Sequence, residues 1–176
     1  MSAELHRRRA AGRAVRCAVL TVSDTRTAAD DASGALAAER LGAAGHTVVQ
    51  RRIVPDDERQ IQDAVRELAG DAACVVVTGG TGLGPRDVTP EAVEALMWKP
   101  LPGFGELFRA LSFAEIGAAA MLSRATAGLV GDRAAPALAF CCPGSTKAVA
   151  LALDRLIVPE LAHAVWLARP SPFAPE

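Results

Sequence analysis

The segment from Val76 to Asp87 is the part of the sequence richest in residues that could do chemistry. It contains four glycines between Gly79 and Gly84 and ends on an aspartate. Glycine allows positive φ angles and a close approach of the backbone, and successive free N–H groups in such a turn form a nest for an anion such as phosphate. The alternative is a tight strand-to-helix turn that binds nothing.

Two better-known phosphate loops are excluded by the same segment. A Walker A loop needs Lys and then Ser or Thr after its last glycine, where this sequence has Pro85 and Arg86. The dinucleotide fingerprint G-x-G-x-x-G also fails, because Pro85 stands where a third glycine would follow Gly80 and Gly82. If the segment binds phosphate, it does so as a loop of another kind.

Carboxylates near this loop indicate a divalent cation. Asp87 lies five residues after Gly82, and a carboxylate beside a phosphate is repelled unless a cation stands between them. Mg²⁺ suits this arrangement, because it is bound by one or two carboxylates together with waters and substrate phosphates. Asp56 or Asp57 could supply a second carboxylate, although an aspartate after Pro55 at a helix start is more often a cap.

A second segment that could bind an anion is Pro143-Gly144-Ser145-Thr146-Lys147. It opens a predicted helix, and the dipole of a helix favours anions at its N-terminus. The same dipole disfavours a lysine in the first turn. Lys147 therefore either faces a bound phosphate or is an ordinary surface lysine, and the charge argument does not choose between the two.

An open parallel sheet would bring these segments together. Apolar runs predict strands at 15–22, 46–54 and 72–78. Helices are predicted between them, from residue 30 or 33 to 44 before Gly45, and from Pro55-Asp56-Asp57 to Gly70. This alternation predicts an α/β fold with parallel pairing and right-handed crossovers.

Polar or glycine-rich residues follow each of these strands. They are Ser23-Asp24, Asp56-Asp57, Gly79 to Gly82 and, after a later strand, Pro143 to Lys147. Ligands of open α/β sheets bind in the crevice outside the carboxyl ends of the strands, so we expect these segments to meet there. By residue type alone, Asp24 is an ordinary turn residue.

The second half of the chain is less regular. Thr89-Pro90 predicts a helix start, with Thr89 as the N-cap and Pro90 at the first helical position. The other predicted helices are 103–111, 115–122, one that follows Ser145, and 160–168, and the other predicted strands are 126–130 and 137–142.

Composition excludes several classes of function. The net charge is −1, from 19 Lys and Arg against 20 Asp and Glu, so the chain has no bulk attraction for nucleic acid or an anionic membrane. Aromatic residues make up 4% of the chain, which argues against a stacking platform for single strands. The length of 176 residues predicts one domain, 14–169, between a disordered tail, 1–13, and a second tail, 170–176.

Neither a secretory signal nor a membrane span is expected. No apolar h-region follows the charged start, and the longest apolar stretches, such as 134–142, are far below the ~18–20 residues of a span. The four cysteines lie in apolar runs and indicate buried reduced thiols in a cytoplasmic protein. They are Cys17, Cys74, Cys141 and Cys142. The three histidines are scattered, so no imidazole–thiolate metal cluster is predicted.

From Thr78 to Asp87 the sequence resembles the molybdenum-cofactor biosynthesis family, which includes the bacterial MoaB and Mog proteins. The family signature is two aliphatics, Ser or Thr, Gly-Gly, Ser or Thr, Gly, four residues and Asp, and residues 76–87 match it in full. The resemblance extends over nearly the whole chain. Its further segments are 20–26, 54–57, 87–91, 102–106, 120–125 and 143–145.

The resemblance implies a molybdopterin-binding-like fold, three-layer α/β/α with a mostly parallel central sheet. It implies a homotrimer, or a homohexamer built from trimers. The implied ligand is molybdopterin, a pterin phosphate that carries a dithiolene. In catalytic members the reaction is a nucleotidyl transfer, the Mg²⁺- and ATP-dependent adenylylation of the molybdopterin phosphate with release of pyrophosphate.

Residue by residue, the family's two functional aspartates match Asp56 and Asp87, as catalytic groups and Mg²⁺ ligands. This replaces the capping interpretation of Asp56. The implied phosphate- and pterin-binding residues are Ser23, Thr78, Gly79, Gly80, Thr81, Gly82, Pro143, Gly144, Ser145 and Lys147.

The chain departs from the family in one place, because Thr146 replaces the second proline of the Pro-Gly-x-Pro-Lys stretch. The change indicates a more flexible loop around Lys147. The opening of the chain resembles the MoaB type, of which some members lack clear activity. A non-catalytic molybdopterin-binding carrier is therefore the alternative to an adenylyltransferase, and a generic nucleotide-binding protein ranks third.

Overall fold

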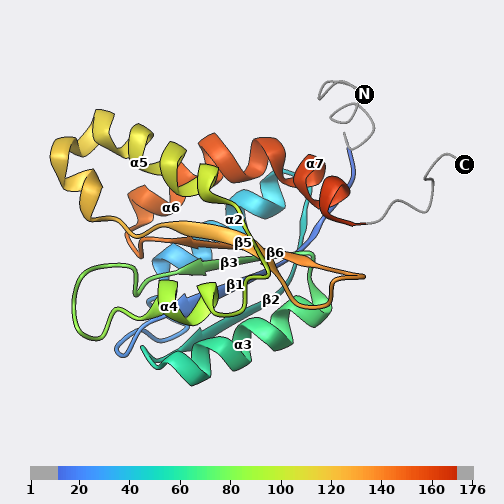
Figure 1. Cartoon of the computed structure of the whole chain (residues 1–176), viewed down its shortest axis with the longest axis horizontal. Coiled ribbons are helices and arrows are strands. Elements are labelled where there is room, and N and C mark those ends of the chain that lie inside the picture. The colour runs from blue at the N-terminus through green and yellow to red at the C-terminus, as the bar shows by residue number, and fades with distance from the viewer. Residues whose placement is uncertain (1–11, 170–176) are drawn as a thin grey trace, which may run out of the picture.

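A six-stranded sheet lies between two layers of helices in the computed structural model, which describes residues 12–169 (Figure 1). The strand order is β2-β1-β3-β6-β5-β4. The strands are β1 (Arg16–Val22), β2 (Thr47–Val54), β3 (Cys74–Thr78), β4 (Lys99–Pro100), β5 (Thr126–Val130) and β6 (Ala137–Cys142). Apart from residues 12 and 13, the predicted tails lie outside the described residues.

The sheet is mostly parallel, as predicted. β1 pairs in parallel with β2 and β3, and β3 pairs in parallel with β6. β5 runs antiparallel to β6, and the two-residue strand β4 runs antiparallel to β5. The carboxyl ends of β1, β2, β3 and β6 therefore share one edge, which is the condition for the polar segments to meet.

The helices form the two outer layers. In Figure 1, α3 and α4 cover one face of the sheet, and α2, α5, α6 and α7 cover the other. The family's three-layer α/β/α architecture is therefore confirmed. The elements are α2 (Ala32–Ala43), α3 (Glu58–Asp71), α4 (Thr89–Glu94), α5 (Pro102–Ile116), the 3-10 helix η1 (Gly117–Leu122), α6 (Thr146–Ala152), the π-helical turn η2 (Leu153–Ile157) and α7 (Val158–Ala168).

Strand residues alternate between two hydrophobic cores. Cys17 and Val19 of β1 pack on the α2 side, whereas Ala18, Leu20 and Val22 pack on the α3 side. Successive side chains of a strand point to opposite faces, so a strand covered on both faces must be apolar throughout. This explains why the central strands appear in the sequence as unbroken apolar runs.

Three predicted helix boundaries are wrong, and glycine is involved in each. Gly70 lies inside α3, which continues to Asp71. The helix predicted at 103–111 continues as α5 to Ile116, because Gly117 with φ +62° is the first residue that ends it. Glu115 therefore belongs to α5, and the predicted helix 115–122 is reduced to η1. A glycine ends a helix where it adopts the left-handed conformation, as Gly45 does with φ +84°, and not by type alone.

Thr89 was expected to cap α4, and this expectation is wrong. Val88 is the N-cap residue and makes no side-chain cap hydrogen bond, while Thr89 is already helical and fully buried. Its hydroxyl, Oγ1, contacts no hydrogen-bond partner among the described residues.

All four cysteines are free and buried, as expected. Burial raises the pKa of Cys142 to about 12, so this thiol stays protonated at neutral pH. No helix within residues 12–169 is both long and apolar enough to cross a membrane.

Candidate functional site

A cavity of about 550 Å³ opens at the carboxyl ends of β1, β3 and β6. Its walls are Thr21, Val22, Ser23, Arg26, Ser33, Thr78, Gly79, Gly80, Thr81, Gly82, Asp87, Leu122, Ser123, Pro143, Gly144 and Ser145. We call it the glycine-loop cavity. The structure thus brings together in its walls every predicted site residue except Asp56, which lies next to Gly80, and Lys147.

The glycines of the loop are required for two different reasons. Gly79 (φ +96°) and Gly80 (φ +62°) adopt a left-handed conformation. A Cβ on Gly79 would also overlap the carbonyl oxygen of Val22 in β1. Gly82 and Gly84 have ordinary φ angles but leave space for a carboxylate, since a Cβ on either would lie 2.8 or 2.7 Å from Asp87 Oδ2.

The free N–H groups are fewer than predicted. Gly79 N–H donates to the Cys142 carbonyl at 3.1 Å, and Gly84 N–H donates to the Asp87 carboxylate at 2.9 Å. The N–H groups of Gly80, Thr81 and Gly82 bond to none of the described residues. The part of the loop that can receive an anion is therefore Gly80 to Gly82.

Arg124 is not among the cavity walls, but its side chain forms hydrogen bonds to the backbone of the glycine loop. Its guanidinium donates to the carbonyl oxygens of Gly82 at 2.9 Å and Asp87 at 2.5 Å, and it pairs with the Glu91 carboxylate. Arginine can bridge several acceptors at once because its donors form a rigid fork. The residue type alone does not distinguish Arg124, since arginines are abundant in this chain.

The two neighbouring aspartates at the start of α3 have different roles. Asp57 is the helix cap, and its carboxylate accepts from Gln60 N–H at 2.9 Å. Asp56 does not cap the helix. Its Oδ1 would lie 2.9 Å from a Cβ on Gly80, so the carboxylate borders the loop. Burial raises the pKa of Asp56, and the charges of Asp24 and Asp87 raise it further.

Asp24 is more than the ordinary turn residue that its type suggested. Its carboxylate accepts from the Arg86 guanidinium at 2.8 Å and from Asp56 N–H at 3.1 Å. These hydrogen bonds from Arg86 and the Asp56 backbone lower the pKa of Asp24. Asp24 therefore connects the loops that follow β1, β2 and β3.

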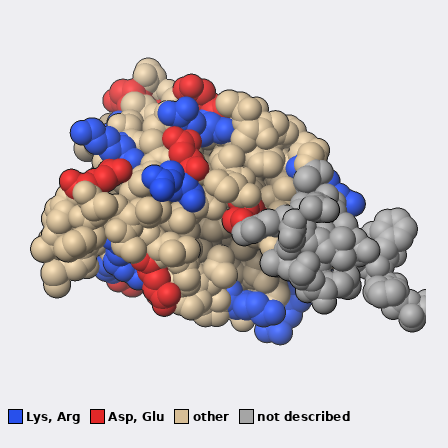
Figure 2. Space-filling view, turned by 90° about the horizontal axis from the view of Figure 1, so that it is seen from above, with Lys and Arg blue, Asp and Glu red and all other residues tan. Residues whose placement is uncertain are grey.

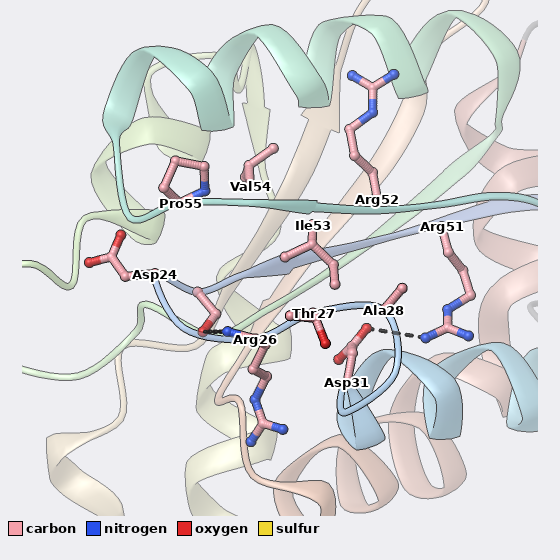
Figure 3. Close-up of a pocket in the computed structure, with 11 residues that line it drawn as sticks. Asp24, Arg26, Thr27, Ala28, Asp31, Arg51, Arg52, Ile53, Val54 and Pro55 are labelled. Carbon is pink, nitrogen blue, oxygen red and sulfur yellow. Dashed lines mark hydrogen bonds and ion pairs between the residues drawn. The ribbon is translucent and has the colours of Figure 1, made fainter.

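A second cavity, of about 580 Å³, lies beside the first at the ends of β1 and β2 (Figure 3). We call it the β2-side cavity. Its walls are Ser23, Asp24, Arg26, Thr27, Ala28, Asp31, Arg51, Arg52, Ile53, Val54 and Pro55. Ser23 and Arg26 line both cavities, so the two are neighbours across these residues.

Asp31 stands between the two cavities. Its carboxylate pairs with Arg51 at 3.2 Å in the β2-side cavity, as the dashed line in Figure 3 shows. The same carboxylate accepts from the hydroxyls of Thr21 and Ser33, which line the glycine-loop cavity. Burial alone would raise the pKa of Asp31, but hydrogen bonds from Gly34 N–H and these side chains outweigh burial and lower the pKa.

Arg52 has a different orientation from Arg51. In Figure 3 it points away from Asp31 toward α3, where it pairs with Glu67 at 2.5 Å. The cations around the β2-side cavity therefore do not converge on one point. Apolar atoms of Ile53, Val54 and Pro55 complete its wall.

The segment after β6 contributes less than predicted. Gly144 approaches the glycine loop closely, since its Cβ would lie 3.2 Å from Gly79 Cα. Ser145 lines the cavity and caps α6 by accepting from Ala148 N–H at 3.2 Å. Lys147 is exposed and is not among the cavity walls.

The residues present fit a Mg²⁺ ion that arrives with a phosphate. Within residues 12–169, no group of three or more His, Cys, Asp or Glu side chains is placed to hold a metal alone. Asp56 and Asp87 nevertheless border the same loop, beside free N–H groups that can bind phosphate. Mg²⁺ needs only one or two carboxylates when substrate phosphates and waters complete its shell.

The fold and the site together define an α/β protein with a glycine-lined cavity at the carboxyl edge of its sheet. The comparisons with known proteins make this class specific. Residues 18–163 match the family model described as "Probable molybdopterin binding domain". The chain belongs to the molybdenum-cofactor biosynthesis family.

Similar proteins carry the same name in several organisms. "Molybdenum cofactor biosynthesis protein B" of Halalkalibacterium halodurans is 51% identical over 166 residues, which are 93% of this chain and 95% of the relative. A crystal structure of a protein of that name aligns with a TM-score of 0.83 at 48% identity and covers 90% of this chain and 98% of the other. The tungsten cofactor synthesizing protein MoaB from Pyrococcus furiosus aligns with a TM-score of 0.82 at 39% identity, over 91% and 100%.

Proposed function

We propose that the protein acts in molybdenum cofactor biosynthesis, where it binds molybdopterin and transfers AMP from ATP to the molybdopterin phosphate. The observation that carries this proposal is the loop from Gly80 to Gly82, with free N–H groups and with Asp56 and Asp87 at its borders. The match to relatives that are named for cofactor biosynthesis supports it.

In the proposed reaction, an oxygen of the molybdopterin phosphate attacks the α-phosphorus of ATP. The bond from that phosphorus to the bridging oxygen breaks, and the electron pair leaves with pyrophosphate. The attacking phosphate is already anionic at neutral pH, so no strong general base is needed. Positioning and charge stabilisation would therefore supply most of the rate enhancement.

The chain's own residues divide these tasks. The N–H groups of Gly80, Thr81 and Gly82 would hold phosphate oxygens, and Arg124 would keep the loop in its shape. Asp56 and Asp87 would hold Mg²⁺, which supplies neutralisation of phosphate charge when it is bound. The hydroxyls of Ser23, Thr78 and Ser145 lie around the same cavity and could orient the pterin or its phosphate.

The two neighbouring cavities support a reaction between two substrates. The glycine-loop cavity offers free N–H groups and hydroxyls to phosphate groups, and the β2-side cavity offers an apolar wall of Ile53, Val54 and Pro55 beside Arg26. Such a wall suits the flat ring of one substrate. Because Ser23 and Arg26 belong to both cavities, a ring in one cavity can be connected to a phosphate in the other.

One observation favours a second candidate, a molybdopterin-binding protein without transferase activity. Lys147 is exposed and outside the cavity walls, and Thr146 precedes it where the family has proline. A carrier would need the glycine loop for binding but would not need a cation at Lys147.

The experiment that separates the candidates uses the purified protein with molybdopterin, ATP and Mg²⁺. Release of pyrophosphate that depends on molybdopterin supports the transferase. Molybdopterin binding without pyrophosphate supports the carrier. ATP binding with no preference for molybdopterin would contradict both and would leave a generic nucleotide-binding protein.

We also propose a homo-oligomer, either a trimer or a hexamer. Five large apolar side chains of α5 and η1 are more than half exposed, and a second copy of the chain would cover them. They are Leu107, Phe113, Ile116, Met121 and Leu122. Acidic and basic side chains are interspersed on the face seen from above, so no large field of one sign opposes such contact (Figure 2). Light scattering on Phe113→Glu against the unchanged protein tests this, and an unchanged mass would contradict it.

A further inference from the structure

Thr89 is a fully buried threonine whose hydroxyl has no hydrogen-bond partner in the described part of the chain. Buried polar groups in folded proteins are nearly always hydrogen-bonded, and one that is not lowers stability. The position would tolerate valine on packing grounds, because valine has nearly the same shape. A hydroxyl kept there at a cost in stability points to a role outside the packing of α4.

The backbone fixes Thr89 to the glycine loop. Thr89 N–H donates to the Gly80 carbonyl at 3.0 Å. A Cβ on Gly80 would overlap Thr89 Oγ1, and the Cβ of Thr89 would lie further away, at 3.3 Å. The hydroxyl is therefore the part of the side chain that faces Gly80.

The Asp56 carboxylate approaches the same point from another loop. The Cβ position of Gly80 lies 2.9 Å from Asp56 Oδ1. A backbone hydrogen bond from Asp24 reaches this carboxylate, and no side chain of the described residues donates to it. An unpartnered hydroxyl and a carboxylate oxygen that receives no side-chain donor thus both lie next to the Cβ position of Gly80, the first of the three loop residues with free N–H groups.

We propose that Thr89 is a positioning residue that donates a hydrogen bond to the Asp56 carboxylate and holds it against Gly80. A threonine hydroxyl reaches a new acceptor by rotation about one bond, and two rotamers are open to threonine in a helix. Thr89 would not touch the ligand, because it is not among the cavity walls. Its effect on the ligand rests on the proposed function, in which Asp56 acts at the glycine loop.

The test compares Thr89→Val, which keeps the shape and removes the hydroxyl, with Thr89→Ser, which keeps the hydroxyl. Pyrophosphate release should fall about ten-fold in Thr89→Val, the effect of one lost hydrogen bond to a charged group, and should recover in Thr89→Ser. Thr89→Val should remain folded, with a slightly lower thermal midpoint that recovers in Thr89→Ser, because it loses one hydrogen bond to a partly exposed carboxylate. In an Asp56→Asn background, Thr89→Val should have no further effect, because the two residues act as one unit.

Two results would overturn the proposal. Equal activity of Thr89→Val and the unchanged protein would show that the hydroxyl is not used. The same ten-fold loss in the Asp56→Asn background would show that Thr89 acts independently of Asp56.

A crystal structure of the unchanged protein tests the Thr89–Asp56 hydrogen bond directly, without any activity measurement. If no pyrophosphate is released, the proposed transferase function fails, but the hydrogen bond can still be observed. An Oγ1–Oδ distance of about 2.7–2.8 Å supports the proposal. A hydroxyl bonded instead to a backbone carbonyl contradicts it.

Discussion

The Arg86 guanidinium donates to both oxygens of the Asp24 carboxylate at 2.8 Å, although the two residues are 62 positions apart. Their contact connects the loop after β1 to the glycine loop. Both side chains are substantially exposed, at 67% for Arg86 and 40% for Asp24, so water and salt weaken the pair. We infer that the contact orders the loops and adds little to global stability.

Arg86→Gln should therefore affect binding more than folding. The thermal midpoint should change little, while molybdopterin binding should weaken several-fold at low salt and less at high salt, because screening already weakens the ion pair there. Equilibrium binding at two ionic strengths checks this. A loss of binding that is the same at both would contradict an electrostatic role for the pair.

Asp87→Asn should lower pyrophosphate release by at least ~10²-fold, the scale of losing a group that stabilises charge in the transition state. Asp57→Asn is the matched control. Asn caps a helix about as well as Asp, and Asp57 caps α3 outside the cavity, so its activity should stay normal. Normal turnover in Asp87→Asn would refute the proposed role of Asp87.

Asp56→Asn should make the protein more stable at pH 7. The folded protein raises the pKa of Asp56 above 3.8 through burial and the neighbouring carboxylates. A raised carboxyl pKa contributes stability below 3.8, and that contribution is lost as the pH rises through the folded-state pKa. Urea unfolding should give the variant a higher free energy of unfolding than the unchanged protein at pH 7. Below pH 3.8 the two free energies should be equal. A variant that is less stable at pH 7 would contradict the cause of the shift.

Two glycine substitutions should have opposite effects on the free energy of unfolding. Gly70→Ala, within α3 and with open space around its Cβ, should stabilise the protein by about 0.5–1 kcal/mol. Gly80→Ala should destabilise it by more than that, because φ is +62° and the new methyl group would overlap Thr89 Oγ1. Urea titrations of both variants check the signs. A stabilising Gly80→Ala would show that the loop conformation is different.

Asp31→Ala should destabilise the protein by about 2–3 kcal/mol, because it removes the cap of α2 and leaves the Thr21 and Ser33 hydroxyls without their acceptor. Asp63→Ala is the control. Within residues 12–169 Asp63 pairs with Arg66 alone, and both are exposed on α3, so its loss should stay within about 0.5 kcal/mol. Chemical denaturation of both variants measures the difference, and equal effects would contradict the buried role of Asp31.

Apolar patterning was sufficient to predict five of the six strands, because a strand buried on both faces must be apolar throughout. The two-residue strand β4 (Lys99–Pro100) was not predicted, because both of its residues are exposed and form no apolar run. The predicted strands 126–130 and 137–142 coincide with β5 and β6. Their antiparallel pairing could not be predicted, because the two strands alone do not specify their partners. Helix ends were less certain, since Gly70 and Gly117 are the same residue type and only Gly117 adopts a positive φ.

The candidate site could be predicted in its loops but not in its side-chain contacts. Gly79 to Gly82 and Asp87 follow one strand, so the topology alone places them together. The resemblance, and not spacing, distinguished Asp56 from Asp57. Arg124 and Arg51 could not be found, because their importance depends on Gly82 and Asp31, which lie 42 and 20 positions away in the chain.

The Asp31 carboxylate contacts residues of both cavities, Thr21 of the glycine-loop cavity and Arg51 of the β2-side cavity. A substitution that moves this carboxylate on one side would therefore also disturb its hydrogen bonds on the other. Under the proposed function, adaptation to a different ring on one side would have to preserve the phosphate contacts on the other. The two halves of such a recognition surface can diverge only together.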